Sequence, residues 1–155
     1  MKIYLAGPYA SRFYLKKKIA PALCAAGHTI TSRWIDEPKE NDCLAAYIKA
    51  RRAGACEADL AIESELGRVA FADDTDLQRA DMLIRFPPLH GVETGGGRLV
   101  ETGLAIAYNL DIVLVGPRSN IFDYLPMIRQ YPDFETMLRK VFGPAAAETF
   151  GSGSD

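Results

Sequence analysis

The chain has 155 residues, of which 48% are hydrophobic and 25% charged, and its 18 basic and 20 acidic side chains give a formal net charge of -2. This length fits one ordinary domain with a real core. The balanced charge argues against binding to a nucleic acid polymer or to a membrane surface. We expect one domain over residues 1–150 and a flexible tail over residues 151–155, which read GSGSD.

The cysteines and the apolar runs indicate in which cellular compartment the protein is expected. Cys24, Cys43 and Cys56 are odd in number and lack CxxC or Cys/His metal spacing, so we expect free thiols in a reducing cytosol and no metal site. The first apolar run is too short for a signal peptide, and no run approaches the roughly 20 apolar residues of a membrane span. These features predict a cytoplasmic protein without a membrane partner.

The first third of the chain alternates between strand and helix patterns. Residues 2–7, KIYLAG, form a short apolar run that ends at Gly-Pro, as a buried strand does before a loop. Helical spacing follows over residues 13–26, with Gly27 as a stop signal and Pro21 as a point where the helix kinks or splits. Residues 28–34, HTITSRW, are rich in β-branched residues and predict a second strand.

The remaining chain continues the alternation. Residues 43–80 predict two helices, divided either near Gly54 or around the FADDTD segment at 71–76. A third strand at 81–86 runs into a glycine-rich loop. The pattern then predicts a helix through about residue 109, a fourth strand over 111–116, a loop over 117–126 and a final helix over 133–142.

Strands that alternate with helices predict an α/β fold, because parallel neighbouring strands need crossover connections. We therefore expect a single-domain, doubly wound parallel sheet of four to five strands with a flavodoxin-like order. Ligands of such sheets bind beyond the carboxyl ends of the strands. The loops expected there carry a dense set of polar and aromatic side chains, which predicts a small-molecule pocket: Tyr9, Ser11, Arg12, Arg33, Trp34, Asp36, Glu93, Arg98 and Asn120.

Glu101 is the acid closest to the glycine-rich loop in the helix that follows it. A carboxylate in the first turn of a helix lies near free backbone N–H groups and the positive end of the dipole, which favours its ionised form, and an ionised carboxylate in a pocket is a potential nucleophile. Acids also favour first turns for helix stability alone. The chain lacks GxGxxG after its first strand and GxxxxGK[ST] anywhere, so we expect no nicotinamide or ATP chemistry and no cofactor.

Five segments together resemble a known family in their order and spacing: KIYLAGPY, GHTITSRW, DDTDLQRADMLI, GGGRLVETGLAIA and VGPRSNIF. The family is that of the nucleoside 2-deoxyribosyltransferases, with the related deoxynucleoside 5'-monophosphate N-glycosidases, and the resemblance covers residues 2 to about 125. It implies cleavage of an N-glycosidic bond through a covalent glycosyl-glutamate. The sugar then passes to another free nucleobase in the transferases and to water in the hydrolases.

The resemblance implies three catalytic residues. Glu101 in RLVETGLA occupies the position of the nucleophile, and Tyr9 the position of a tyrosine that follows the first strand and hydrogen-bonds to it. Asp73, eight residues before Asp81, occupies the position of the aspartate that binds and protonates the base, with Asp76 as a neighbouring candidate. Structural alternatives stay open: the hydroxyl group of Tyr9 can point into water, and acidic residues such as Asp73 and Asp76 often cap helices.

Two further positions concern recognition of the nucleobase and the formation of an oligomer. Gly95 stands where the transferases commonly have a second base-contacting aspartate, and Glu93 is either a substitute or a loop charge. Asn120 resembles an asparagine that family members extend across a subunit contact to a neighbour's sugar, which implies a homo-oligomer; alternatively it ends a turn.

The remaining expectations concern the substrate. Ser11, Arg12, Arg33 and Arg98 could hold a 5'-phosphate, or be structural, and Trp34 and Phe86 could stack on a base, or pack in the core. A non-catalytic nucleotide-binding module is the competing function, and a flavoprotein is disfavoured because the first loop lacks a Ser/Thr-rich phosphate cradle. The expected substrate-binding residues are Gly7, Ser11, Arg12, Arg33, Trp34, Asp76, Gly97, Arg98 and Asn120.

Overall fold

The computed structural model describes residues 1–36, 53–54, 60–88 and 96–151. Within these residues five strands form one all-parallel sheet of order β2-β1-β3-β4-β5. This is the doubly wound, flavodoxin-like α/β arrangement, so the expected fold is confirmed. The strands are β1 (Lys2–Ala6), β2 (Thr29–Ile30), β3 (Met82–Arg85), β4 (Asp111–Val115) and β5 (Ile128–Tyr131).

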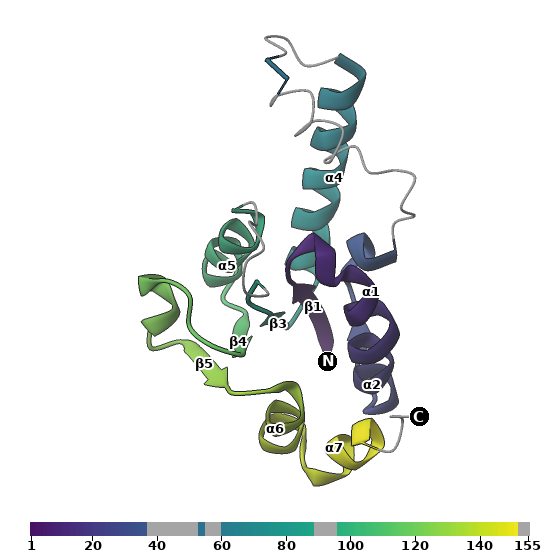
Figure 1. Cartoon of the computed structure of the whole chain (residues 1–155), viewed down its shortest axis with the longest axis vertical. Helices are drawn as coiled ribbons and strands as arrows, with labels where there is room; N and C mark the ends of the chain where they lie inside the picture. The colour runs from purple at the N-terminus through teal and green to yellow at the C-terminus, as the bar shows by residue number, and fades with distance from the viewer. Residues whose placement is uncertain (37–52, 55–59, 89–95, 152–155) are drawn as a thin grey trace.

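The helices flank the sheet in two groups (Figure 1). In one group α4 (Leu60–Gln78) packs on α5 (Gly97–Ala107), and α5 lies on β3 and β4. In the other group α2 (Ala20–Ala25) packs on β2 and α7, and α6 lies next to β5. The remaining helices and short turns are η1 (Tyr9–Ser11), α1 (Arg12–Tyr14), η2 (Leu15–Ile19), η3 (Arg33–Asp36), η5 (Ile121–Tyr124), α6 (Phe134–Met137), η6 (Leu138–Phe142) and α7 (Pro144–Gly151).

The central strands are buried on both faces, which explains their continuous apolar runs. Ile3, Tyr4 and Leu5 of β1 are all fully buried, although successive side chains point to opposite faces of the sheet. In the register of β1 with β3, Tyr4 pairs with Leu83 and Ala6 with Arg85. Tyr4 and Arg85 therefore project on the same face, the one that α5 covers.

The second strand is shorter than expected, because side chains replace its backbone pairing. Only Thr29 and Ile30 form β2, whereas the strand was expected over residues 28–34. Beyond them, Leu5 N donates to Ser32 Oγ at 2.5 Å, and Trp34 Nε1 donates to Leu5 O at 2.8 Å. Two side chains thus satisfy the backbone N–H and carbonyl groups of Leu5, and the chain leaves the sheet to form η3.

Two helix predictions have different outcomes. A break around FADDTD is wrong, because α4 runs through this segment without interruption. Gly54 lies in a turn with φ +83°, but residues 43–52 and 55–59, with Cys43 and Cys56, lie outside the described residues. Pro21 lies where the helix changes type: η2 before it is a π turn in which Ala20 N donates to Leu15 O, and Pro21 is the second residue of α2, where its missing N–H costs little.

The end of the chain contains a strand that the sequence pattern did not locate. β5 lies between the expected loop and the expected last helix, and it forms the edge of the sheet beside β4. The expected tail begins at Gly151, the last residue of α7, and residues 152–155 lie outside the described part. No helix in the described ranges has both the length and the hydrophobicity that crossing a membrane requires.

Candidate functional site

Glu101 lies in the second turn of α5, not in the first. The helix begins at Gly97 after the N-cap Gly96, and its first turn contains no acidic residue. The effect of the helix dipole falls off within the first turn, so the helix terminus is not the main influence on this carboxyl group. The expectation that the terminus keeps Glu101 ionised is therefore wrong, and its neighbours decide its charge.

The neighbour that contacts Glu101 most directly is Tyr4. Tyr4 Oη donates a hydrogen bond to Glu101 Oε1 at 2.7 Å, from a side chain that is fully buried in β1. Burial, followed by the charge of Glu101, raises the pKa of Tyr4 far above its usual value. The hydroxyl group thus stays protonated at any working pH, and it orients one carboxyl oxygen.

The pKa of Glu101 is raised from its ordinary value. Burial is the largest cause, and the hydrogen bond from Tyr4 and the charge of Arg98 lower the pKa without compensating for it. A half-buried carboxyl group of this kind ionises at higher pH than one in water. It can act as a nucleophile when ionised or donate a proton when neutral.

Tyr9, the tyrosine expected beside Glu101, contacts Arg12. Its hydroxyl accepts a hydrogen bond from Arg12 Nη1, and the guanidinium of Arg12 lies 4.4 Å from the centre of its ring. The hydrogen bond that the resemblance assigned to Tyr9 belongs to Tyr4. Sequence reasoning missed Tyr4 because it lies within an apolar strand, where the pattern predicts that a tyrosine is a core residue.

Arg12 is a buried cation at the start of the first helix. It is 1% exposed, its guanidinium lies within 5.0 Å of the ring centres of both Tyr9 and Phe13, and its Nε has no hydrogen-bond partner in the described structure. No ion pair of Arg12 occurs among the described residues. Because an unpaired buried charge is costly, this guanidinium suits an anionic ligand.

Gly7, Ser11 and Gly97 are further expected substrate-binding residues in the segments after β1 and β3. A Cβ on Gly7 would lie 3.2 Å from Leu15 Cδ1, so close packing of η2 against the end of β1 favours glycine at this position. Ser11 is half-buried, and its backbone N–H donates to Pro8 O. Gly97 is exposed at the start of α5, with open space where a Cβ would be.

The acidic run on α4 divides into three environments. Asp76 is buried and accepts hydrogen bonds from Arg33 N at 3.0 Å and Arg33 Nε at 2.8 Å, which ties η3 to α4. Asp74 accepts from Tyr108 Oη at 2.6 Å and joins α4 to α5. Asp73 is half-buried, and its charge contributes to the raised pKa of Tyr4, as that of Asp76 does.

The expected base-stacking aromatics are core residues. Trp34 is 8% exposed and uses its indole N–H on Leu5 O, and Phe86 is 9% exposed with its ring against Phe134. The packing interpretation therefore describes both side chains. Glu93 and Gly95, as well as His90, lie outside the described residues.

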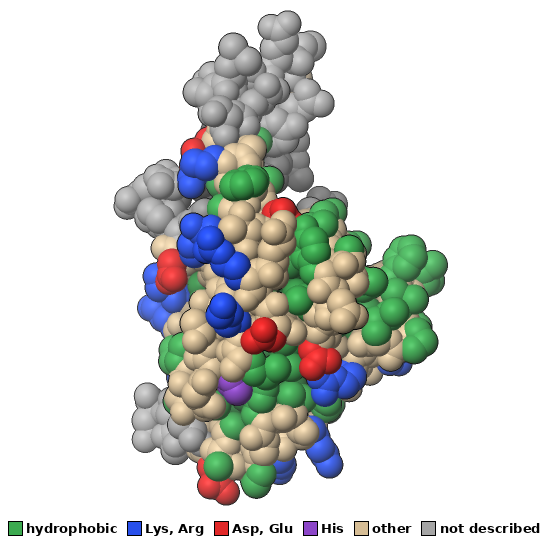
Figure 2. Space-filling model, turned by 180° about the vertical axis from the view of Figure 1, so that it is seen from behind, with side chains coloured by type: hydrophobic (Ala, Val, Ile, Leu, Met, Phe, Trp, Pro, Cys, Tyr) green, Lys and Arg blue, Asp and Glu red, His purple; other side chains and the backbone are tan. Residues whose placement is uncertain are grey.

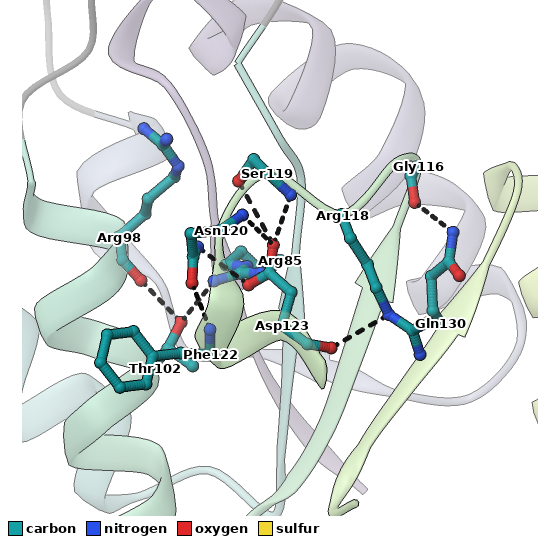
Figure 3. A network of polar contacts seen from close by, with 10 residues as sticks. All are labelled: Arg85, Arg98, Thr102, Gly116, Arg118, Ser119, Asn120, Phe122, Asp123 and Gln130. Atoms are coloured by element: carbon teal, nitrogen blue, oxygen red, sulfur yellow. Dashed lines mark hydrogen bonds and ion pairs between the residues drawn. The ribbon is translucent and has the colours of Figure 1, made fainter. Parts of the chain in front are cut away.

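Asn120 caps a turn in the segment between β4 and β5. Its Oδ1 accepts from Phe122 N at 2.8 Å, and its Nδ2 donates to Asp123 Oδ1 at 3.0 Å. Asn120 thus begins the η5 turn rather than ending one, and both polar atoms of its side chain are used within one chain. Asp123 also pairs with Arg85, and Figure 3 shows both at the centre of a polar network that sequence reasoning missed.

The chain was compared with models of protein families, with curated proteins and with solved structures, and none of them matches it.

Proposed function

We propose that the chain is a nucleoside 2-deoxyribosyltransferase, which cleaves the N-glycosidic bond of 2'-deoxynucleosides and passes the sugar to another base. The observation that carries the proposal is the hydrogen bond from Tyr4 Oη to Glu101 Oε1. It orients a half-buried carboxyl group in the helix that follows β3, on the side of the sheet where the strands end and α/β folds bind ligands. The resemblance of the sequence to the family supports the same role for Glu101.

The proposed mechanism has two halves. A Glu101 oxygen bonds to C1' as the bond from C1' to the base nitrogen breaks through an oxocarbenium-like state, which leaves a glycosyl ester. Asp73 is the candidate that gives a proton to the departing base. A second base then attacks C1', gives its proton back to Asp73 and releases the Glu101 carboxylate.

The decisive experiment is incubation of the protein with deoxynucleosides and deoxynucleotides, each with and without a second free base. Exchange that depends on the second base supports the transferase. Release of free base without an acceptor identifies a hydrolase. If no substrate loses its base, the enzymatic proposal is wrong and a non-catalytic nucleotide-binding module becomes the better description.

Arg12 favours a second candidate, a deoxynucleoside 5'-monophosphate N-glycosidase. Its buried guanidinium has no carboxylate partner among the described residues and a free Nε. Arginine binds phosphate through charge-assisted hydrogen bonds, and a 5'-phosphate would neutralise this cation. The same covalent step at Glu101 would serve both reactions, with water in place of the second base.

Substitution of Arg12 separates the two candidates. If Arg12 binds a 5'-phosphate, Arg12→Leu lowers kcat/KM for monophosphates about 10- to 100-fold, because a hydrogen bond to a charged group contributes roughly 1.5–3 kcal/mol, and changes it little for nucleosides. The measurement is base release from matched nucleoside and monophosphate pairs. Arg139→Leu is the control, since Arg139 pairs with Glu135 on an exposed part of the chain. Equal losses on both substrates would count against a phosphate contact.

Tyr4→Phe tests the contact on which the proposal depends. It removes a hydrogen bond that lowers the pKa of Glu101, so this pKa rises further. Because the ionised carboxylate is the nucleophile, the acidic limb of kcat/KM shifts to higher pH, and kcat falls about tenfold as orientation is lost. The measurement is a pH profile of base release. An unchanged profile would show that Tyr4 does not act on Glu101.

We also propose that the chain forms a homo-oligomer. Hydrophobic side chains gather on a protruding part of the surface in Figure 2, and the segment that joins β4 to β5 exposes Ile121, Phe122, Tyr124 and Met127. Exposed apolar groups of this size mark interaction sites. Phe122→Asp is expected to reduce the oligomer to monomers in sedimentation, whereas Phe71→Asp, on α4, serves as the exposed aromatic control. A monomeric wild-type protein would contradict the proposal.

A further inference from the structure

A buried ion pair links three elements that are distant in sequence. Arg85, at the carboxyl end of β3, is 2% exposed, and its partner Asp123 in η5 is fully buried. Arg85 Nη1 also donates to Thr102 Oγ1 at 3.3 Å, and Thr102 Oγ1 donates to the carbonyl oxygen of Arg98 at 2.7 Å. The pair thus joins the first turns of α5 to the segment after β4.

Asp123 organises that segment. Ser119 N donates to Asp123 Oδ2 at 2.7 Å, and Asn120 N and Asn120 Nδ2 donate to its two oxygens at 3.3 and 3.0 Å (Figure 3). Burial raises the pKa of Asp123, but the hydrogen bond from Arg85 and those from the backbone outweigh burial and hold it below its usual range. The carboxylate stays ionised and fixes the turn.

On the other side, the network ends beside Glu101. Thr102 follows Glu101 directly, and Arg98 is three residues before Glu101, on the same face of the helix. The charge of Arg98 lowers the pKa of Glu101 without compensating for burial, and the pKa of Arg98 itself is lowered by burial and then by the charge of Arg85. The network thus holds the turn of α5 whose Glu101 accepts the hydrogen bond from Tyr4.

We propose that the Arg85–Asp123 pair is a positioning unit: it fastens residues 119–123 and the start of α5 to the end of β3, and so sets where Glu101 stands relative to Tyr4 of β1. The catalytic part of this inference rests on the proposed function. Stability alone is a weak reason for the pair, because apolar residues of similar volume often replace a buried ion pair without loss. Orientation is what such a replacement cannot supply.

That difference defines the test, the double variant Arg85→Met/Asp123→Leu. It fills the same space with apolar groups, so we expect a folded protein with a melting temperature near that of the wild type. The pKa of Glu101 is then followed by carbon-13 NMR of its carboxyl group. Among the described residues, the two groups that act on Glu101, Tyr4 of β1 and Arg98 of α5, remain in the variant, as do Asp73 and Asp76 of α4, whose charges act on Tyr4.

We expect the pKa of Glu101 to rise by about half a unit or more as α5 shifts and the hydrogen bond from Tyr4 weakens. Base release should show the same shift in its acidic limb and a fall in kcat of about tenfold, with a smaller change in KM. A folded double variant with an unchanged Glu101 pKa would overturn the proposal and leave the pair a purely structural role. If the double variant does not fold, Thr102→Val removes the same link with little change in volume and is judged by the same shift.

Two comparisons make the result specific. Arg129→Met breaks the exposed pair with Asp111, at the other end of β4, and should leave the Glu101 pKa unchanged. The NMR measurement does not need activity. If the double variant shifts the Glu101 pKa but the wild-type protein releases no base, the positioning unit is supported and the proposed function is rejected. If the wild-type protein releases base but the double variant leaves the Glu101 pKa unchanged, the proposed function is supported and the positioning unit is rejected.

Discussion

Glu101→Gln is expected to abolish base release while the protein stays folded. The amide keeps the shape of the side chain and an oxygen that can accept the hydrogen bond from Tyr4, but it cannot form a stable ester with C1'. Loss of a covalent nucleophile removes most of the catalysis, so we expect a decrease of about 10³-fold or more. The measurement is chromatographic detection of free base over time, at saturating substrate.

The control for this substitution is Glu135→Gln, which changes an exposed glutamate of α6 in an ion pair with Arg139. It should leave base release unchanged. Glu101→Ala should be equally inactive, although it leaves the buried Tyr4 hydroxyl without its acceptor and costs roughly 1–3 kcal/mol of stability. Retention of more than a few per cent of activity by the glutamine variant would remove Glu101 as the nucleophile. Full retention of ligand binding and of every measurable function would favour the binding module.

Asp123→Ala is expected to destabilise the protein more than any other single substitution considered. It leaves Arg85 buried without its carboxylate, and removal of one partner of a buried ion pair costs about 3–5 kcal/mol. For a domain of this size the melting temperature should fall by about 10 °C. Thermal and denaturant unfolding measure the effect.

Asp111→Ala is the matched control, because Asp111 forms an exposed pair with Arg129 at 3.3 Å. Its effect should stay within about 0.5 kcal/mol. The pKa of Asp123 is lowered in the folded state, so its contribution is fully present above its unfolded pKa of about 3.9 and is lost as the pH falls through the folded value. A loss of stability that is equal in the two variants would show that the buried pair contributes no more than a surface pair.

The framework of the fold was predictable from local pattern. The short apolar runs of β1, β3 and β4 are buried on both faces, and such runs separated by helical spacing leave a parallel sheet as the consistent arrangement. β5 was not located, because its edge position leaves Arg129 and Gln130 exposed and gives it no apolar run. The predicted strand at residues 28–34 was too long, because nothing local shows that the side chains of Ser32 and Trp34 bind the backbone of β1.

The sequence by itself determined the α/β class, the parallel sheet and the helix that carries Glu101, because these depend on hydrophobic periodicity over a few residues. The tertiary structure decided which side chains surround Glu101. Tyr4 and Glu101 are 97 positions apart, and Arg85 and Asp123 are 38 apart. A local pattern indicates which face of an element is buried, but the partner of a buried polar group depends on which strands become neighbours and in which register, and only the folded sheet sets both.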